Sequence, residues 1–272
     1  MKTLSVNASP AVGLSVAGDP KGQPQGQPDE PSLRFPELPE LDFPEGEMVV
    51  FDPARHLRFV SVDADKSASD SALLPLARAV RANPGIMLIP RDEDCLALWD
   101  RYAMLPHIRE HSRKVADMAQ AIALRALELG VKVNADAVRA AGMLHDLGKT
   151  WSIARGGQHA QLGAAWVMRE TRNAPLARAV LFHVFWPFAE KGDATHFMIM
   201  AIIYADKRTL HDGYVGLEER YADLVERYGI NAAVRERILL SHQQGKRIEE
   251  RLSRLLGVTL YEYTADRGRL VR

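Results

Sequence analysis

The chain has 272 residues, of which 47% are hydrophobic and 26% charged, as is usual for a globular protein with a sizeable core. Lysine plus arginine and aspartate plus glutamate number 35 each, so the formal net charge is zero and no overall basic field is available to hold long nucleic acid. Cys95 is the single cysteine, which excludes an intramolecular disulfide and any metal site built from several cysteines of one chain.

Residues 1–47 contain eight of the fifteen prolines, together with many glycines, glutamines, serines and aspartates. Such a segment cannot bury enough apolar surface to offset the entropy of ordering it, so we expect a disordered tail without a catalytic role. The tail lacks the apolar run of a secretory signal, and the longest apolar run of the chain, 197–205, is too short to span a membrane. These features predict a soluble, cytoplasmic protein.

Residues 48–90 predict a small accessory α/β element. The β-branched and aromatic stretch 48–62 favours one or two short strands. A short helix is expected over 72–82 and a strand over 86–89, ending at Pro90.

From residue 91 to 272 the pattern is almost wholly helical, and we expect a helical core with further C-terminal helices. Asp92 is placed as the cap of a first helix, and Pro106 begins a long second helix that Gly130 closes. Asn134 or Asp136 opens the next helix, which is expected to end near Gly148. Five more helices are expected at about 159–171, 175–185, 195–211, 217–228 and 231–255.

Several metal-capable side chains fall on the apolar stripes of these helices. His111, for example, lies four residues before Val115 on a stripe that continues at steps of three and four. A single inward histidine is most often a hydrogen-bonded core residue. A carboxylate among isoleucines, as at Asp206, is costly unless it is paired or binds a cation. The inward set is His111, His145, Asp146, His159, His183 and Asp206.

The hydrogen-bonding and charge requirements of four inward histidines and two inward carboxylates are met most simply if these side chains bind metal. Imidazole nitrogen and carboxylate oxygen suit divalent Mn, Fe, Co, Ni or Zn, or Mg with fewer histidine ligands. The sequence therefore predicts one or two divalent metal ions in this core.

The order of these residues resembles that of the HD-domain superfamily of metal-dependent phosphohydrolases over about residues 91–210. The motifs that support this resemblance are HSRKVADMA at His111, GMLHDLGK at His145 and Asp146, and IIYADK at Asp206. His159 in GGQHAQLGA and His183 in AVLFHVFWP are similar to the two intermediate histidines of the dinuclear branch. The motif ADKRTL differs from the ADYIEP-like element of dinucleoside-tetraphosphate hydrolases, and no His-His pair of the cyclic-di-GMP phosphodiesterase type is present.

The resemblance implies a role for each of these residues. His111, His145, Asp146 and Asp206 would hold the first metal. Asp146 would bridge to a second metal, held also by His159 and His183. The implied reaction is attack of metal-bound hydroxide on phosphorus.

Phosphate binding also needs cationic side chains. Lys149, three residues after Asp146, is the foremost candidate for substrate binding and catalysis, with Lys207 and Arg208 beside the last ligand as further substrate contacts. Each of them could equally be a surface charge. The aromatic run around His183, from Phe182 to Phe188, is compatible with a nucleobase wall, with core packing or with a lid.

The sequence thus predicts a phosphohydrolase acting on a phosphate ester or anhydride of a nucleotide or another small molecule, with no membrane partner and no long nucleic acid. A non-catalytic metal- or nucleotide-sensing module and a di-iron oxygenase on the same scaffold are the alternatives. The charged stretch 217–255 is typical of a solvated face or of a helix in a homodimer.

Overall fold

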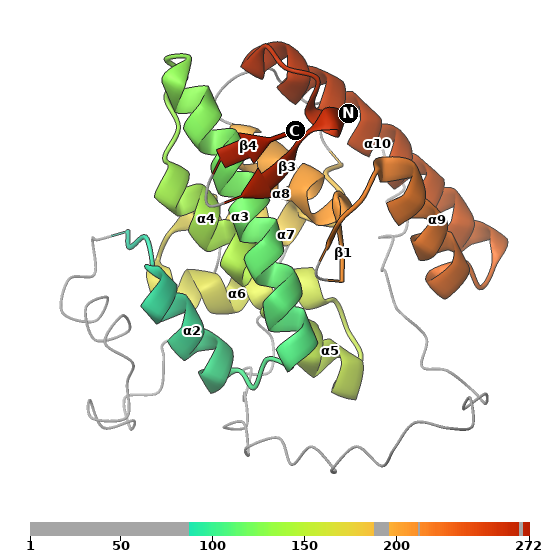
Figure 1. Cartoon of the computed structure of the whole chain (residues 1–272). Coiled ribbons are helices and arrows are strands. Elements are labelled where there is room, and N and C mark those ends of the chain that lie inside the picture. The colour runs from blue at the N-terminus through green and yellow to red at the C-terminus, as the bar shows by residue number, and fades with distance from the viewer. Residues whose placement is uncertain (1–86, 188–195, 212, 267–268) are drawn as a thin grey trace, which may run out of the picture.

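The computed structural model describes residues 87–187, 196–211, 213–266 and 269–272. In this part of the chain the fold is mainly α, as predicted, with two short antiparallel hairpins (Figure 1). The elements are α2 (Asp92–Arg101), α3 (Pro106–Glu128), α4 (Ala135–Leu144), α5 (Lys149–Arg155), α6 (His159–Thr171), α7 (Ala174–Phe182), α8 (Phe197–Lys207), β1 (Thr209–Leu210), β2 (Gly213–Tyr214), α9 (Leu217–Tyr228), α10 (Ala232–Leu256), the 3₁₀ turn η3 (Leu260–Glu262), β3 (Thr264–Asp266) and β4 (Arg269–Val271).

The signals that begin and end helices are confirmed at several places. Pro106 is the first residue of α3, and the chain leaves that helix through Gly130, whose φ of +81° is easily reached only by glycine. Asn134 caps α4 by accepting a hydrogen bond of 2.9 Å from the Ala137 N–H. The bounds of α6 and α9 are those predicted from the sequence.

Several predicted bounds are wrong, among them the end of α7, which lies at Phe182 rather than at residue 185. Asp92 is not a cap but the first residue of α2, and the N–H of Arg91 before it is accepted instead by Asp94. The α4 helix ends at Leu144, and a turn through Gly148 separates it from α5, which the sequence pattern did not predict. The α8 helix ends at Lys207, because the chain then enters the hairpin of β1 and β2.

The predictions for residues 1–47 and most of those for 48–90 lie outside the described residues. The described residues 87–89 of the predicted strand form no strand. They are tied to the helical part through Leu88, whose N–H donates to Thr171 O at 2.9 Å and whose carbonyl accepts from Asn173 Nδ2 at 3.0 Å.

The α3 helix is the centre of the described fold, because it contacts α4, α8, α10 and both strands of the second hairpin. Figure 1 shows α3 running through the middle of the molecule, with β3 and β4 lying across it and the α9–α10 pair at one side. The stripe predicted for α3 is fully buried at Val115, Met118, Ile122 and Ala126. Burying it places the N-terminal half of α3, with His111, beside the ends of α4 and α8.

The strands are short and were not predicted. Residues 209–210 pair with 213–214, and 264–266 pair with 269–271, both in antiparallel register. Strands of two or three residues carry too little alternation to be recognised in a sequence. Among the described helices, none is both long enough and apolar enough to cross a bilayer.

Arg139 on α4 ties three helices together. Its guanidinium donates to both carboxylate oxygens of Asp92 on α2, at 2.7 Å each, and to Asp117 on α3 at 2.8 Å. Replacing it with alanine is expected to lower the free energy of unfolding by about 1 kcal/mol, because the pairs are partly exposed and the stem of the side chain also packs.

Urea denaturation measures this loss. Arg125→Ala, which removes an exposed pair with Glu128 on α3, is the control and is expected to remain near wild type. Equal losses in the two variants would contradict the assigned role of Arg139.

Candidate metal centre

The six residues of the predicted metal set come from five helices and meet at one place. Two of them end helices, one begins a helix, and Asp146 occupies the turn that follows α4. All but His159 are buried, and the side chain of His159 is 28% exposed. Their positions are His111 in α3, His145 at the end of α4, Asp146 in the turn, His159 at the start of α6, His183 at the end of α7 and Asp206 in the last turn of α8.

The cluster consists of two groups that share Asp146. His111 and His145 form the first group with Asp146, and His159 and His183 form the second. Within each group the donor atoms lie within 4.8 Å of one another. Asp206 adjoins the first group, because its Oδ1 lies 3.0 Å from His111 Nε2 and 3.9 Å from His145 Nε2.

The two oxygens of Asp146 face different groups. Oδ1 lies 3.4 Å from His159 Nε2 and 3.5 Å from His183 Nε2, while Oδ2 lies 3.4 Å from His145 Nε2. A carboxylate in this position can ligate two cations at once. The shared position matches the bridging role that the resemblance implied.

Backbone carbonyls orient two of the imidazoles. His145 Nδ1 lies 2.8 Å from Gly142 O, and His183 Nδ1 lies 2.7 Å from Val180 O, each three residues earlier in the chain. Donation from Nδ1 to a carbonyl leaves the Nε2 lone pair of the neutral ring free and directed into the cluster. Between the two rings of the second group, His159 Nε2 and His183 Nε2 lie 3.2 Å apart. This is about the separation expected of two adjacent nitrogen ligands about 2.1 Å from one metal.

Electrostatics favour ionised carboxylates in this cluster and neutral imidazoles at His111, His159 and His183. Burial lowers the pKa of His159 to about 3 and also lowers the pKa of His183. Burial lowers the pKa of His145 as well, but Asp146 and Asp206 outweigh it and raise that pKa. Burial alone raises the pKa of Asp146, but the Lys149 ammonium and His145 outweigh it and hold that pKa well below the usual range. At His111, His159, His183 and the carboxylates these are the protonation states that metal ligation requires.

Two polar atoms in the cluster are suited to bind a cation. His145 Nε2 and Asp146 Oδ1 are fully buried, and neither has a hydrogen-bond partner among the described residues. A buried acceptor without a partner is costly, and a divalent cation would satisfy both atoms. The donor set of nitrogen and carboxylate oxygen fits Mn, Fe, Co, Ni or Zn.

Close backbone contacts set the spacing of the helices that carry the ligands. A Cβ on Gly148 would lie 2.4 Å from His159 O and 2.8 Å from Gly163 N. A Cβ on Gly142 would lie 2.5 Å from the Ala116 Cα on α3. In the sequence Gly148 was interpreted only as the end of a helix, a common place for glycine, and Gly142 was not singled out.

The two lysines near the cluster each hold one carboxylate oxygen. Lys149 Nζ lies 2.7 Å from Asp146 Oδ2, and Lys207 Nζ lies 2.6 Å from Asp206 Oδ2. The Lys149 side chain is 34% exposed, so it can also reach a substrate, whereas the Lys207 side chain is only 7% exposed. Lys207 is therefore placed to orient Asp206 rather than to meet a substrate.

The structure does not bring Arg208 to the cluster as a substrate contact, contrary to the sequence prediction. Its guanidinium donates to Tyr204 Oη, to Val215 O and to the carbonyls of residues 260, 261 and 263. The side chain is buried, and all five of its N–H donors are taken up by the protein. Arg208 instead fastens the C-terminal segment to the end of α8.

The aromatic residues around His183 mostly belong to the core. Phe182 and Trp186 are buried, while Phe185 is 38% exposed; Phe188 lies outside the described residues. Core packing therefore accounts for the two buried rings.

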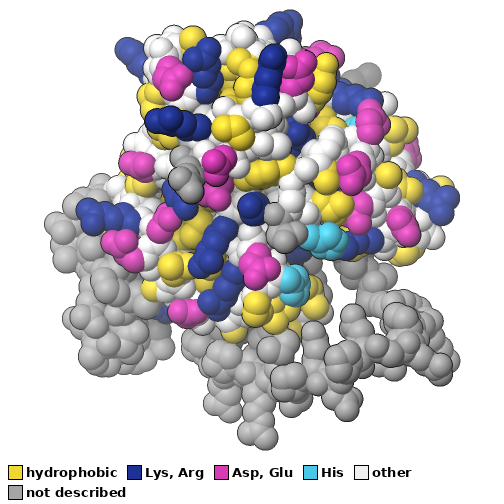
Figure 2. Space-filling view, viewed as in Figure 1, with side chains coloured by type: hydrophobic (Ala, Val, Ile, Leu, Met, Phe, Trp, Pro, Cys, Tyr) yellow, Lys and Arg dark blue, Asp and Glu magenta, His cyan; other side chains and the backbone are white. Residues whose placement is uncertain are grey.

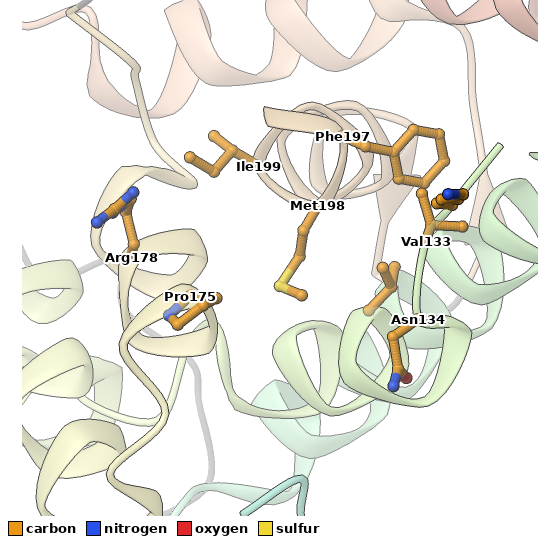
Figure 3. Close-up of a pocket in the computed structure, with 9 residues that line it drawn as sticks. Val133, Asn134, Pro175, Arg178, Phe197, Met198 and Ile199 are labelled. Atoms are coloured by element: carbon orange, nitrogen blue, oxygen red, sulfur yellow. The ribbon is translucent and has the colours of Figure 1, made fainter. Parts of the chain in front are cut away.

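One cavity of about 220 Å³ lies among the beginnings of α4, α7 and α8 (Figure 3). Phe197, Met198 and Pro175 form its apolar wall, and Lys132 and Arg178 are its cationic residues. None of the six cluster residues lines it.

The comparison with known families agrees with the geometry. The model of the HD domain family matches residues 108–229, a range that contains all six residues of the cluster. No curated protein and no solved structure matches the chain. HD domains bind divalent metals and are generally hydrolases. The resemblance found in the sequence is thereby confirmed for residues 108–229, which match the HD domain family.

Proposed function

We propose that the protein is a metal-dependent phosphohydrolase that cleaves a phosphate ester or anhydride of a nucleotide or another small molecule with water. The observation that carries the proposal is the shared position of Asp146 between two metal-capable groups, His111 with His145 and His159 with His183. Enzymes that catalyse nucleophilic displacement at phosphorus commonly use two adjacent divalent cations.

The proposed ligands are those of the two groups. His111, His145 and Asp206 would hold one cation, His159 and His183 would hold the other, and Asp146 would serve both. Divalent cations bound here supply Lewis acidity that polarises a phosphoryl group and activates water. Manganese, iron, cobalt, nickel, zinc or magnesium are the candidate metals, and the four histidines favour a transition metal over magnesium.

Lys149 has two proposed tasks. Its ammonium fixes Asp146 Oδ2, which keeps Oδ1 turned toward His159 and His183. Burial lowers the pKa of Lys149, but Asp146 and Asp206 outweigh it and raise the pKa, so the ammonium stays charged near neutral pH. The exposed part of this side chain can contact a phosphoryl oxygen and stabilise the charge that develops during cleavage.

The face shown in Figure 2 fits a small substrate better than a long nucleic acid. On the face shown in Figure 2, lysine and arginine side chains alternate with aspartate and glutamate, and no continuous basic track is visible. A polyanion needs such a track, whereas one phosphate group needs only the cluster and Lys149.

The test is phosphate release by the metal-loaded protein. The purified chain is stripped with a chelator, reloaded anaerobically with Mn²⁺, and offered nucleoside mono-, di- and triphosphates, dinucleoside polyphosphates and small phosphomonoesters. Metal-dependent release of phosphate or nucleotide supports the proposal. Metal binding without turnover of any of these would contradict it in favour of a sensing module, and turnover only in the presence of oxygen would favour a di-iron oxygenase.

Lys149→Met is expected to lower kcat/KM about a hundredfold, because one cationic partner of the transition state is removed. The content of bound metal should stay at the wild-type value, since no ligand is lost and a nearby positive charge is removed. Elemental analysis and steady-state kinetics on the same preparation check both statements. Lys132→Met, at an exposed position, is the control.

A further inference from the structure

The turn that follows His183 is held from outside the HD match. Trp186 in this turn is 2% exposed, and its backbone N–H donates to Gln244 Oε1 at 3.0 Å. The Nε2 of Gln244 donates in return to Trp186 O at 2.7 Å. One amide side chain on α10 thus satisfies both backbone groups of a buried residue, as a neighbouring strand would.

Further contacts fix the face of α10 that carries Gln244. Ser241, one turn earlier, donates from its hydroxyl to Val184 O at 3.4 Å. The Tyr221 hydroxyl on α9 donates to Ser241 O at 2.7 Å. A Cβ on Gly245 would lie 3.2 Å from that hydroxyl, so the glycine lets Tyr221 lie close against α10. These contacts keep Gln244 turned toward the turn at 184–186.

His183 lies three residues before Trp186 and belongs to the second group of the metal centre. Its Nε2 is 3.2 Å from His159 Nε2 and 3.5 Å from Asp146 Oδ1. His183 ends α7, so no later helical turn holds its backbone, and the following residues must be fixed by other elements. In the described residues that task falls to Gln244 and Ser241.

We infer that Gln244 is a positioning residue for the second metal site, acting through the backbone of the turn at 184–186 on His183. The inference rests on the proposed function, in which His159, His183 and Asp146 hold a cation. It adds that the HD domain as matched, 108–229, does not contain everything its second metal site needs, because α10 lies beyond that range.

The test compares Gln244→Ala with Gln243→Ala in the full chain. Gln243 is exposed on the same helix, so its replacement controls for the loss of a glutamine side chain from α10. Each protein is stripped and titrated with Mn²⁺ by equilibrium dialysis and elemental analysis. We expect Gln244→Ala to bind the first ion as wild type does and the second at least about tenfold more weakly, as for other groups that orient ligands. Gln243→Ala should match wild type at both sites.

The variant Gln244→Glu tests whether the effect of Gln244→Ala comes from a general loss of folding. The carboxylate can still accept from the Trp186 N–H but cannot donate to Trp186 O, so the affinity for the second ion should be intermediate. Thermal unfolding of all three variants is recorded without metal.

Wild-type affinity for the second ion in Gln244→Ala would overturn the inference, and so would an equal weakening of both ions that follows a lower melting temperature. A wild-type chain that binds no second ion at all contradicts the proposed function itself, and this is seen without any variant.

Discussion

Replacement of Asp146 with alanine is expected to remove both metal ions and to lower phosphate release at least about a thousandfold, which corresponds to about 4 kcal/mol of transition-state stabilisation. Asp146 is the one residue common to both metal-capable groups found in the described part of the chain. Its loss also leaves Asp206 as the one carboxylate of the proposed set to offset the charge of two buried cations. Elemental analysis and a phosphate-release assay on the same preparation measure the two effects.

Two other variants test whether this result is specific to Asp146 as the ligand shared by both groups. Asp136→Ala, at an exposed position in α4, should keep both ions and full activity. His183→Ala should keep the first ion and weaken the second, since His183 belongs to one group alone. An Asp146→Ala protein that still binds two ions, or that turns over at the wild-type rate, would refute the assignment of a shared ligand.

Gly148→Ala is expected to have the second largest effect. The added Cβ would lie 2.4 Å from His159 O and 2.8 Å from Gly163 N, and both are backbone atoms that cannot turn away. The turn after α4 and the start of α6 must therefore move apart, which carries His159 away from Asp146. We expect a loss of about 2 kcal/mol in the free energy of unfolding and a weakened second metal ion.

Gly216→Ala is the matched control, because a Cβ there meets nothing within 4 Å and the backbone φ of −71° suits alanine. Urea denaturation and Mn²⁺ titration on the two variants separate the effects. If Gly148→Ala bound its second ion as tightly as Gly216→Ala, the close contact would have no part in shaping the site.

The positions of the helices could be predicted because their apolar stripes and end signals are local. Pro106, Gly130 and Asn134 act within one turn of their own helix, so their effect can be recognised without knowledge of the fold. The same periodicity selected the inward side chains, and the structure brings these into one cluster.

What the sequence did not predict depends on contacts between distant segments. Gly148 matters because α6 approaches it, and Gln244 because the turn after α7 does, 58 residues away in the chain. Arg208 was placed in the site because it is close to Asp206 in sequence, but neighbouring residues at the end of a helix face different directions. The side chain instead reaches carbonyls more than 50 residues downstream.

The hydrogen bonds that the five N–H groups of Arg208 donate also determine how far the chain can be truncated. A fragment trimmed to the matched range 108–229 would retain this buried cation but lose its acceptors at residues 260, 261 and 263. A buried cation without its acceptors opposes folding, and here it would do so two residues from Asp206. A fragment suited to expression therefore extends at least through residue 263, well past the end of the family match at residue 229.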